Sequence, residues 1–85
     1  MNVIYADEFR KCFLKLPKEI QSLFRKQEKI FRKYWRDPRL HVKKLSGHPL
    51  LFSFRVTRNY RVLFHFISEN TVLFATIGNR KNIYR

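Results

Sequence analysis

The sequence predicts an α+β domain in which an N-terminal helical hairpin packs on a twisted antiparallel sheet of about four strands. Three observations predict it. In the first half of the chain, apolar residues recur every three to four positions, as in amphipathic helices. In the second half, apolar and polar residues alternate, as in half-buried strands. The length of 85 residues suits one domain, so we assign residues 1–85 to a single unit.

A short strand and two helices make up the predicted N-terminal half. Residues 2–5 form the strand, and Asp7 then favours a helix start, because acidic side chains stabilise the positive end of a helix. Pro17 separates this helix from a second one, which is expected to end before Pro38. The apolar stripe of the second helix consists of Ile20, Leu23, Phe24, Gln27, Ile30, Phe31 and Tyr34.

Three strands in a meander make up the predicted C-terminal half. They span residues 51–56, 60–67 and 71–77, with turn-like segments between them. Residues 40–49 are expected to form a loop before the sheet, and residues 79–85 a basic tail. The helices should cover one face of the sheet and leave the other face free.

The register of the first hairpin follows from its two faces. A three-residue turn at 57–59 places Phe54 opposite Val62, so that the apolar faces match. The same register places Arg55 opposite Arg61 on the face away from the helices. Directly opposed like charges destabilise a sheet. An anion bound between the two arginines explains the pair; two solvated arginines that splay apart are the alternative.

The last strand is expected to bring a third arginine to this face. Pairing Phe66 with Val72 and Phe64 with Phe74, and continuing without interruption, places Ile77 opposite Arg61. Residues 78–80 then leave the sheet beside that arginine, so Arg80 should reach the same surface. The sequence therefore predicts an anion-binding cluster on the free face of the sheet.

The charge balance indicates the kind of partner. Nineteen Lys and Arg against six Asp and Glu give a net charge of +13, which attracts polyanions. Nucleic acid is the expected partner, because each neutralised phosphate releases a counterion. An acidic protein partner and a merely soluble basic protein remain alternatives. The residues expected to contact RNA are Lys43, Lys44, Arg25, Lys29, Arg32 and Arg58.

Several classes of protein are not expected. Cys12 is the single cysteine, so we expect neither an internal disulfide nor a structural zinc site, and no cofactor. The first nine residues lack the long apolar core of a signal peptide. No apolar run approaches the length of a membrane span. The expected location is the cytoplasm, with no membrane partner.

Four short motifs follow the two helical segments in a fixed order. They are Lys-Leu-Ser-Gly at 44–47, Phe-Ser-Phe-Arg-Val at 52–56, Tyr-Arg-Val-Leu-Phe at 60–64, and Ile-Gly-Asn-Arg-Lys-Asn-Ile-Tyr at 77–84. With these motifs the chain resembles the RelE/ParE superfamily of toxin–antitoxin toxins over most of its length. The resemblance implies the same helical hairpin on an antiparallel sheet.

The resemblance also implies an activity and partners. RelE-like members are ribosome-dependent endoribonucleases that cut mRNA without a metal, using the RNA's own 2′-hydroxyl to attack the adjacent phosphate. The implied partners are a small acidic antitoxin, through which the toxin forms oligomers, and the ribosome with its mRNA. Two alternatives stay open: a ParE-type inhibitor of DNA gyrase, which is not a nuclease, and a member that keeps only antitoxin binding.

The resemblance assigns site residues one at a time. Arg61 matches the phosphate-clamping arginine, and Arg80 matches the arginine after the last strand. Tyr84 matches the terminal tyrosine, which stacks on a base. Arg55 lies where a lysine often serves, whereas Ser53 replaces its basic companion.

This match does not identify the residue that accepts the proton of the 2′-hydroxyl. Many members have His where this chain has Asn79, and arginine stays protonated in proteins. The three histidines are the remaining candidates, His41, His48 and His65. His48 lies in the loop before the sheet and is taken as a candidate catalytic residue, whereas His65 should share the face of Arg61.

Overall fold

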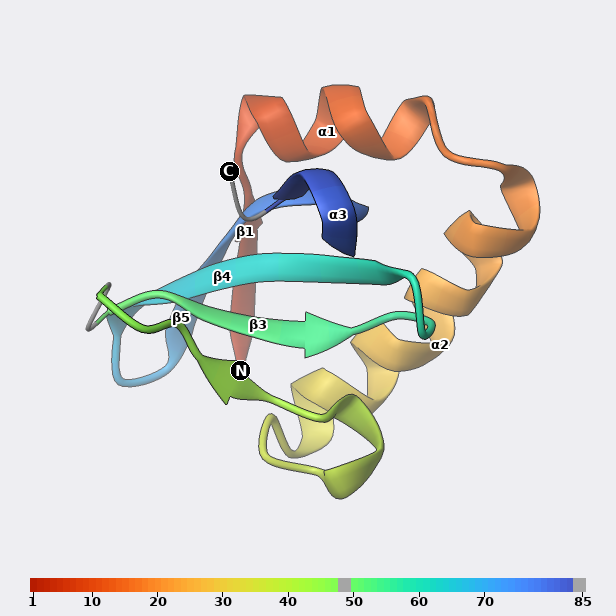
Figure 1. Cartoon of the computed structure of the whole chain (residues 1–85). Helices are drawn as coiled ribbons and strands as arrows, with labels where there is room; N and C mark the ends of the chain where they lie inside the picture. The colour runs from red at the N-terminus through yellow and green to blue at the C-terminus, as the bar shows by residue number, and fades with distance from the viewer. Residues whose placement is uncertain (48–49, 84–85) are drawn as a thin grey trace.

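Two helices and a five-stranded sheet form the two main layers of the molecule (Figure 1). The computed structural model describes residues 1–47 and 50–83. The elements follow one another as β1 (Asn2–Tyr5), α1 (Asp7–Leu14), α2 (Lys18–Lys33), the 3-10 helix η1 (Pro38–Leu40), β2 (Lys43–Lys44), β3 (Phe52–Arg55), β4 (Tyr60–Ser68), β5 (Thr71–Asn79) and α3 (Arg80–Ile83). The predicted α+β class and the helical hairpin on a sheet are confirmed.

The sheet differs from the prediction in two respects. Its order is β1-β5-β4-β3-β2, and β1 runs parallel to β5, so the sheet is mixed and not purely antiparallel. The fifth strand, β2, lies where we expected only a loop, with Lys43 opposite Ser53 and Lys44 opposite Phe52. A two-residue strand is too short to show any alternation of apolar and polar residues.

Phe31 of α2 lies at the centre of an aromatic core. Its ring centroid is 5.1 Å from that of Phe54, 5.0 Å from that of Phe64 and 5.3 Å from that of Phe74. All four rings are fully buried. These rings join α2 to β3, β4 and β5. Phe31 meets Phe64 and Phe74 edge to face, which adds to the stabilisation from burial.

Helix α2 ends at Lys33, five residues before Pro38, where the helix was expected to stop. Tyr34 is already extended (φ −158°, ψ 101°), and its ring is exposed, so its place in the apolar stripe was wrong. Trp35 packs instead, with its ring centroid 5.0 Å from that of Phe66. The extended residue turns the chain, so the helical spacing no longer applies beyond Lys33.

A β-bulge shifts the register between β4 and β5. The predicted pair Phe64 and Phe74 is confirmed, but the next pairs are Leu63 with Thr76, Val62 with Ile77 and Arg61 with Gly78. The prediction of Ile77 opposite Arg61 was therefore wrong by one residue. A bulge places two residues of one strand against one of the other. It keeps Ile77 on the buried face, where uninterrupted pairing would have placed it on the opposite one.

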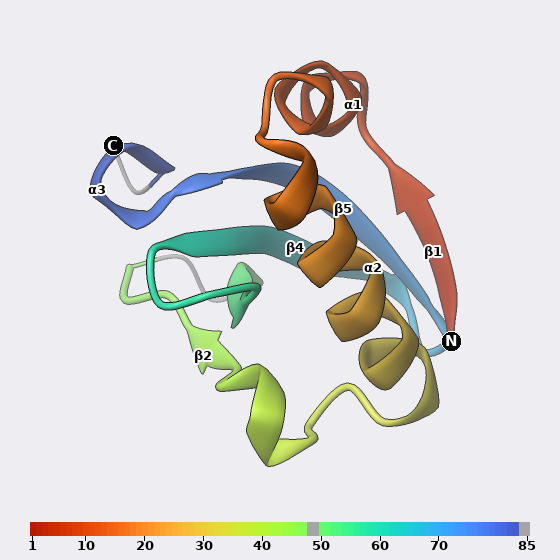
Figure 2. The same cartoon turned by 90° about the vertical axis from the view of Figure 1, so that its right-hand side faces the viewer.

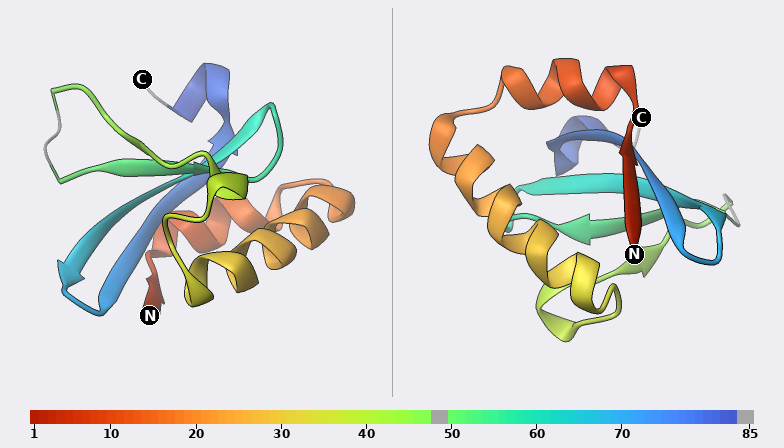
Figure 3. Two further views of the ribbon diagram at one scale, coloured as in Figure 1. Left: turned by 90° about the horizontal axis from the view of Figure 1, so that it is seen from below. Right: turned by 180° about the vertical axis from the view of Figure 1, so that it is seen from behind.

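The face away from α1 and α2 is not free, contrary to the prediction. The predicted tail begins with helix α3, which lies on the side of the sheet opposite α1 and α2 (Figures 2 and 3). Ser53, Leu63 and Arg61 point to this second face, and all three are buried. The second face is therefore a partly covered surface that contains a buried arginine.

We expect Phe31→Ala to lower the free energy of unfolding by about 3–5 kcal/mol, because it removes the ring that α2 packs against three strands. Leu14→Ala is the control, since Leu14 is 77% exposed and should cost less than about 0.5 kcal/mol. Urea unfolding followed by circular dichroism measures both. Equal losses would show that Phe31 does not hold the two layers together.

Candidate anion-binding site

Arg55 and Arg61 lie directly opposite each other on β3 and β4, as predicted. Phe54 and Val62 form the neighbouring pair, and both are buried in the core. Residues opposed across antiparallel strands have α-carbons about 4.5–5.5 Å apart. The side chains of Arg55 and Arg61 therefore leave the backbone at adjacent positions on the second face of the sheet.

The side chain of Arg61 forms hydrogen bonds with the hairpin turn that follows β3. Its side chain is largely buried, with 8% of the residue exposed. Nη1 donates to the carbonyl oxygen of Thr57 at 2.7 Å and to that of Arg58 at 3.1 Å. The turn carbonyls thus compensate part of the charge of Arg61 and fix its guanidinium against the turn.

Arg55 carries a buried donor that lacks a partner among the described residues. Its Nε is shielded from solvent and makes no hydrogen bond there. Burying a donor without an acceptor costs about 1–3 kcal/mol. Its backbone is held firmly, because its carbonyl oxygen accepts a hydrogen bond from Nε2 of Gln27 at 2.9 Å. An anion at this position would supply the missing acceptor.

Arg80 joins the same turn through its backbone. Its N–H donates to the carbonyl oxygen of Asn59 at 2.8 Å. Asn79 caps the short helix that follows, because its Oδ1 accepts from the N–H of Lys81 at 2.9 Å. The side chain of Arg80 is exposed. The turn at 57–59 therefore links β3, β4 and the start of α3, with one arginine from each.

A cleft of 380 Å³ lies between α1, the end of β5 and α3. Gly78, which is opposite Arg61, and Asn79, which precedes Arg80, both line it. Glu8 of α1 is the one carboxylate among the described lining residues. Glu8 was not predicted as a site residue, because nothing in the sequence shows that α1 and α3 enclose the end of β5.

The other predicted residues are distributed over both layers. Arg58 is exposed in the turn that Arg61 holds, and Lys43 and Lys44 are exposed on edge strand β2. Arg25, Lys29 and Arg32 lie on α2 in the other layer, away from the Arg55–Arg61 pair. His48 and Tyr84 lie outside the described residues.

The histidines of the described chain are not close to the arginine pair along the strands. His65 shares the face of Arg61, as expected, but it is four residues further along β4, or about 13 Å. His41 follows η1 and is exposed, with a left-handed backbone (φ 47°). Within residues 1–47 and 50–83, no three His, Cys, Asp or Glu side chains gather as metal ligands. The same residues contain no helix long and apolar enough to cross a membrane.

Solved structures with this architecture are numerous. The RelB–RelE antitoxin–toxin complex of Methanococcus jannaschii superposes with a TM-score of 0.77 at 23% identity, covering 95% of this chain and 94% of that one. The toxin–antitoxin complex RelBE2 of Mycobacterium tuberculosis gives 0.69 at 27%, covering 93% and 96%. E. coli YafQ gives 0.78 at 11%, covering 99% and 98%.

The chain has the RelE/ParE toxin fold. The resemblance inferred from the four motifs is thereby confirmed for the fold. Neither a family model nor a curated protein sequence matches the chain. The likeness is thus carried by architecture, and the roles of individual residues in this RelE/ParE-like protein rest on its own geometry.

Arg61→Ala is expected to lower the free energy of unfolding by about 1–3 kcal/mol, because it leaves the carbonyl oxygens of Thr57 and Arg58 without their donor. Arg80→Ala removes an exposed side chain and should change stability by less than about 0.5 kcal/mol. Chemical unfolding of the two variants measures the difference. If Arg61→Ala is as stable as the wild type, then Arg61 does not hold the turn.

Proposed function

We propose that this protein is the toxin of a toxin–antitoxin pair and that it cleaves mRNA on the ribosome. The observation that carries the proposal is the convergence of Arg55, Arg61 and Arg80 at one turn, where Nε of Arg55 is a buried donor that has no partner among the described residues. A scissile phosphate is an anion that fits this arrangement. The fold, shared with RelE and YafQ, supports the same reading.

The chemistry needs charge stabilisation and two proton transfers. The 2′-hydroxyl of the RNA attacks the adjacent phosphorus, the bond to the 5′-oxygen breaks, and a cyclic phosphate and a free 5′-hydroxyl result. Negative charge grows on the phosphate oxygens in the transition state, and fixed cations stabilise that charge without reorganisation. We assign Arg55 and Arg80 to the phosphate, whereas Arg61 fixes the turn and adds its positive charge.

Glu8 is our candidate for the group that accepts the proton of the 2′-hydroxyl. Arginine stays protonated and cannot take this role. Asn79, where many relatives have His, caps α3 in this chain. Glu8 lines the same cleft as Gly78, which is opposite Arg61, and Asn79, which precedes Arg80. A carboxylate within hydrogen-bond reach of a hydroxyl can act as general base.

We infer the partners from the same fold and from the charge. Of the structures named above, that from M. jannaschii is a RelB–RelE antitoxin–toxin complex, and that from M. tuberculosis is the toxin–antitoxin complex RelBE2. A chain with a net charge of +13 would bind a small acidic antitoxin, and oligomers would form through that complex. The ribosome and its mRNA are the proposed target, and the cytoplasm is therefore the proposed location.

Arg55→Ala and Arg80→Ala should each reduce mRNA cleavage by roughly tenfold or more, because each removes a cation from the transition-state phosphate. Primer extension on mRNA from translating extracts measures the cuts. Lys81→Ala is the matched control, since Lys81 is also an exposed cation at the start of α3. Undiminished cleavage by both arginine variants would refute the site.

The alternative of a ParE-type gyrase inhibitor is favoured by one observation: the position that is His in many relatives is a helix cap here. It predicts that the wild-type protein inhibits DNA supercoiling by gyrase at concentrations that leave ribosome-bound mRNA intact. A protein that does neither and causes no growth arrest, but still binds its antitoxin, would be a member reduced to antitoxin binding.

Glu8→Gln should lower the rate of mRNA cleavage by about 10²- to 10⁴-fold, the usual loss when a general base is removed. The fold should persist, because Glu8 is exposed in the first turn of α1. Glu19→Gln is the matched control, since Glu19 is the exposed acid in the first turn of α2 and both changes remove the same helix-end charge. Equal rates for the two variants would exclude Glu8 as the base.

A further inference from the structure

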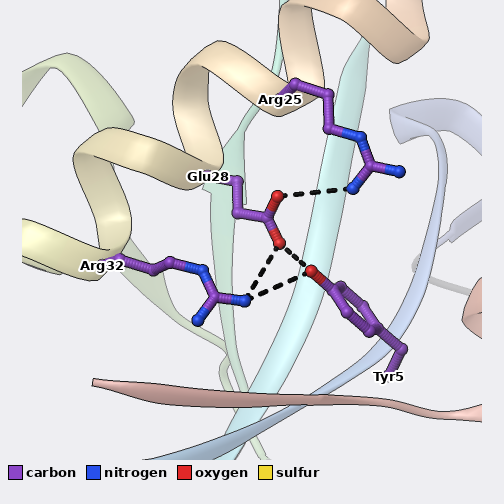
Figure 4. Close-up of polar contacts among 4 residues, drawn as sticks. All are labelled: Tyr5, Arg25, Glu28 and Arg32. Carbon is purple, nitrogen blue, oxygen red and sulfur yellow. Dashed lines mark hydrogen bonds and ion pairs between the residues drawn. The ribbon is translucent and has the colours of Figure 1, made fainter.

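A second group of arginines surrounds Tyr5 and Glu28 in the other layer of the molecule (Figure 4). Nη1 of Arg25 lies 3.4 Å from Oε1 of Glu28, and Nη2 of Arg32 lies 3.5 Å from Oε2. The Tyr5 hydroxyl donates to Oε2 of Glu28 and accepts from Nη2 of Arg32 at 3.3 Å. The guanidinium of Arg10 lies 5.9 Å from the centre of the Tyr5 ring. We call these five residues the Tyr5 cluster.

The carboxylate of the cluster is unusual for its burial. Glu28 is 7% exposed and is the one buried acidic residue in the described part of the chain. Removing a carboxylate from water is costly, and an apolar side chain of similar size would attach α2 to β1 equally well. Burial raises the pKa of the Tyr5 hydroxyl, and its hydrogen bond to Glu28 raises that pKa further. Anchoring the helix therefore does not by itself account for Glu28.

The arginines of the cluster remain available to a partner. The side chains of Arg25 and Arg32 are 58% and 42% exposed, although both are tied to Glu28. The guanidinium of Arg25 also lies 4.9 Å from the ring centre of Phe13. Free arginine side chains lose rotamer entropy when a partner immobilises them. Here the contacts with Glu28, Tyr5 and Phe13 have already restricted them.

The spacing of the cations suits a chain of phosphates. Arg25, Lys29 and Arg32 are separated by four and three residues, so they lie on one side of α2 over about 10 Å. Guanidinium groups bind phosphate through paired hydrogen bonds. Three arginines and one carboxylate leave the cluster with a charge of 3 − 1 = +2.

We propose that Glu28 and Tyr5 are positioning residues that hold Arg25 and Arg32 ready for the phosphate backbone of a structured RNA. This surface is built on α2 and β1, whereas Arg55, Arg61 and Arg80 gather at the turn after β3. The proposal therefore does not depend on cleavage, and a protein without nuclease activity would still have it.

The direction in which one substitution changes RNA affinity distinguishes a positioning role of Glu28 from a simple charge effect. Glu28→Gln removes a negative charge and raises the net charge by one, from +13 to +14. If Glu28 only neutralised the arginines, the variant would bind a polyanion more tightly. If Glu28 positions them, the variant binds more weakly despite its higher charge. Tyr5→Phe changes no charge and keeps the ring, so it tests positioning alone.

The experiment titrates the full-length protein into a fluorescently labelled RNA duplex and follows anisotropy at several salt concentrations. We expect Glu28→Gln and Tyr5→Phe to bind about three- to tenfold more weakly, because two side chains must be ordered on binding. Glu69→Gln is the matched control: it removes an equivalent charge from the exposed turn between β4 and β5, and it should bind as tightly as the wild type or slightly more so.

A double-mutant cycle tests whether Glu28 acts through the arginines. On a background of Arg25→Ala and Arg32→Ala, Glu28→Gln should cause no further weakening, since its effect requires those side chains. Circular dichroism melts confirm that each variant is folded. The proposal is overturned if Glu28→Gln binds the duplex as tightly as Glu69→Gln, or if it still weakens binding without the two arginines. A larger effect on poly-glutamate than on RNA would overturn the choice of nucleic acid.

Discussion

The pairing of β3 with β4 is the constraint on which the second face of the sheet depends. Phe54 and Val62 must both face α2, and side chains alternate strictly along a strand, so the residues next to them must both face the other way. Arg55 and Arg61 are therefore opposed because the core is satisfied, and not because the arginines attract each other. The repulsion is relieved when the carbonyl oxygens of the turn accept from Arg61. Burial of phenylalanine thus creates the cationic surface.

The sequence predicts an element of this structure when its apolar pattern extends over enough residues to show a period. The β3–β4 register was predictable because a short turn joins two strands with clear faces. The bulge opposite Leu63 was not, because one inserted residue leaves no trace in composition and only the burial of Ile77 reveals it. Strand β2 and helix α3 are too short for periodicity to indicate. The position of Glu8 in the cleft depends on the approach of α1, β5 and α3, segments far apart in the sequence, which no local pattern records.

The two cationic surfaces hold their arginines with different acceptors: backbone carbonyls at one and a buried carboxylate at the other. At the turn after β3, backbone carbonyl oxygens accept hydrogen bonds from Arg61, and these carbonyls carry no net negative charge. In the Tyr5 cluster, a buried carboxylate holds Arg25 and Arg32, and part of the charge is cancelled in exchange for fixed geometry. Retained charge suits a centre where negative charge develops, because field strength matters most there. Fixed geometry suits binding to the phosphate backbone of a nucleic acid, because several weak contacts must form together.

In the proposed reaction, the turn at 57–59 separates the groups that hold the phosphate from the group that accepts a proton. It ties together the start of α3, through Asn59 and Arg80, and the side chain of Arg61. These links hold the cations in place. The side chain of the neighbouring Asn79 caps α3, and its amide can neither donate nor accept a proton as a catalyst at neutral pH. A proton acceptor must then come from another element. In the described chain, α1 approaches closely enough to place the carboxylate of Glu8 in the same cleft as Asn79. The proposed cleavage therefore requires two separate features: the arginines that hold the phosphate, and the packing of α1 against the end of β5 that brings Glu8 into the cleft.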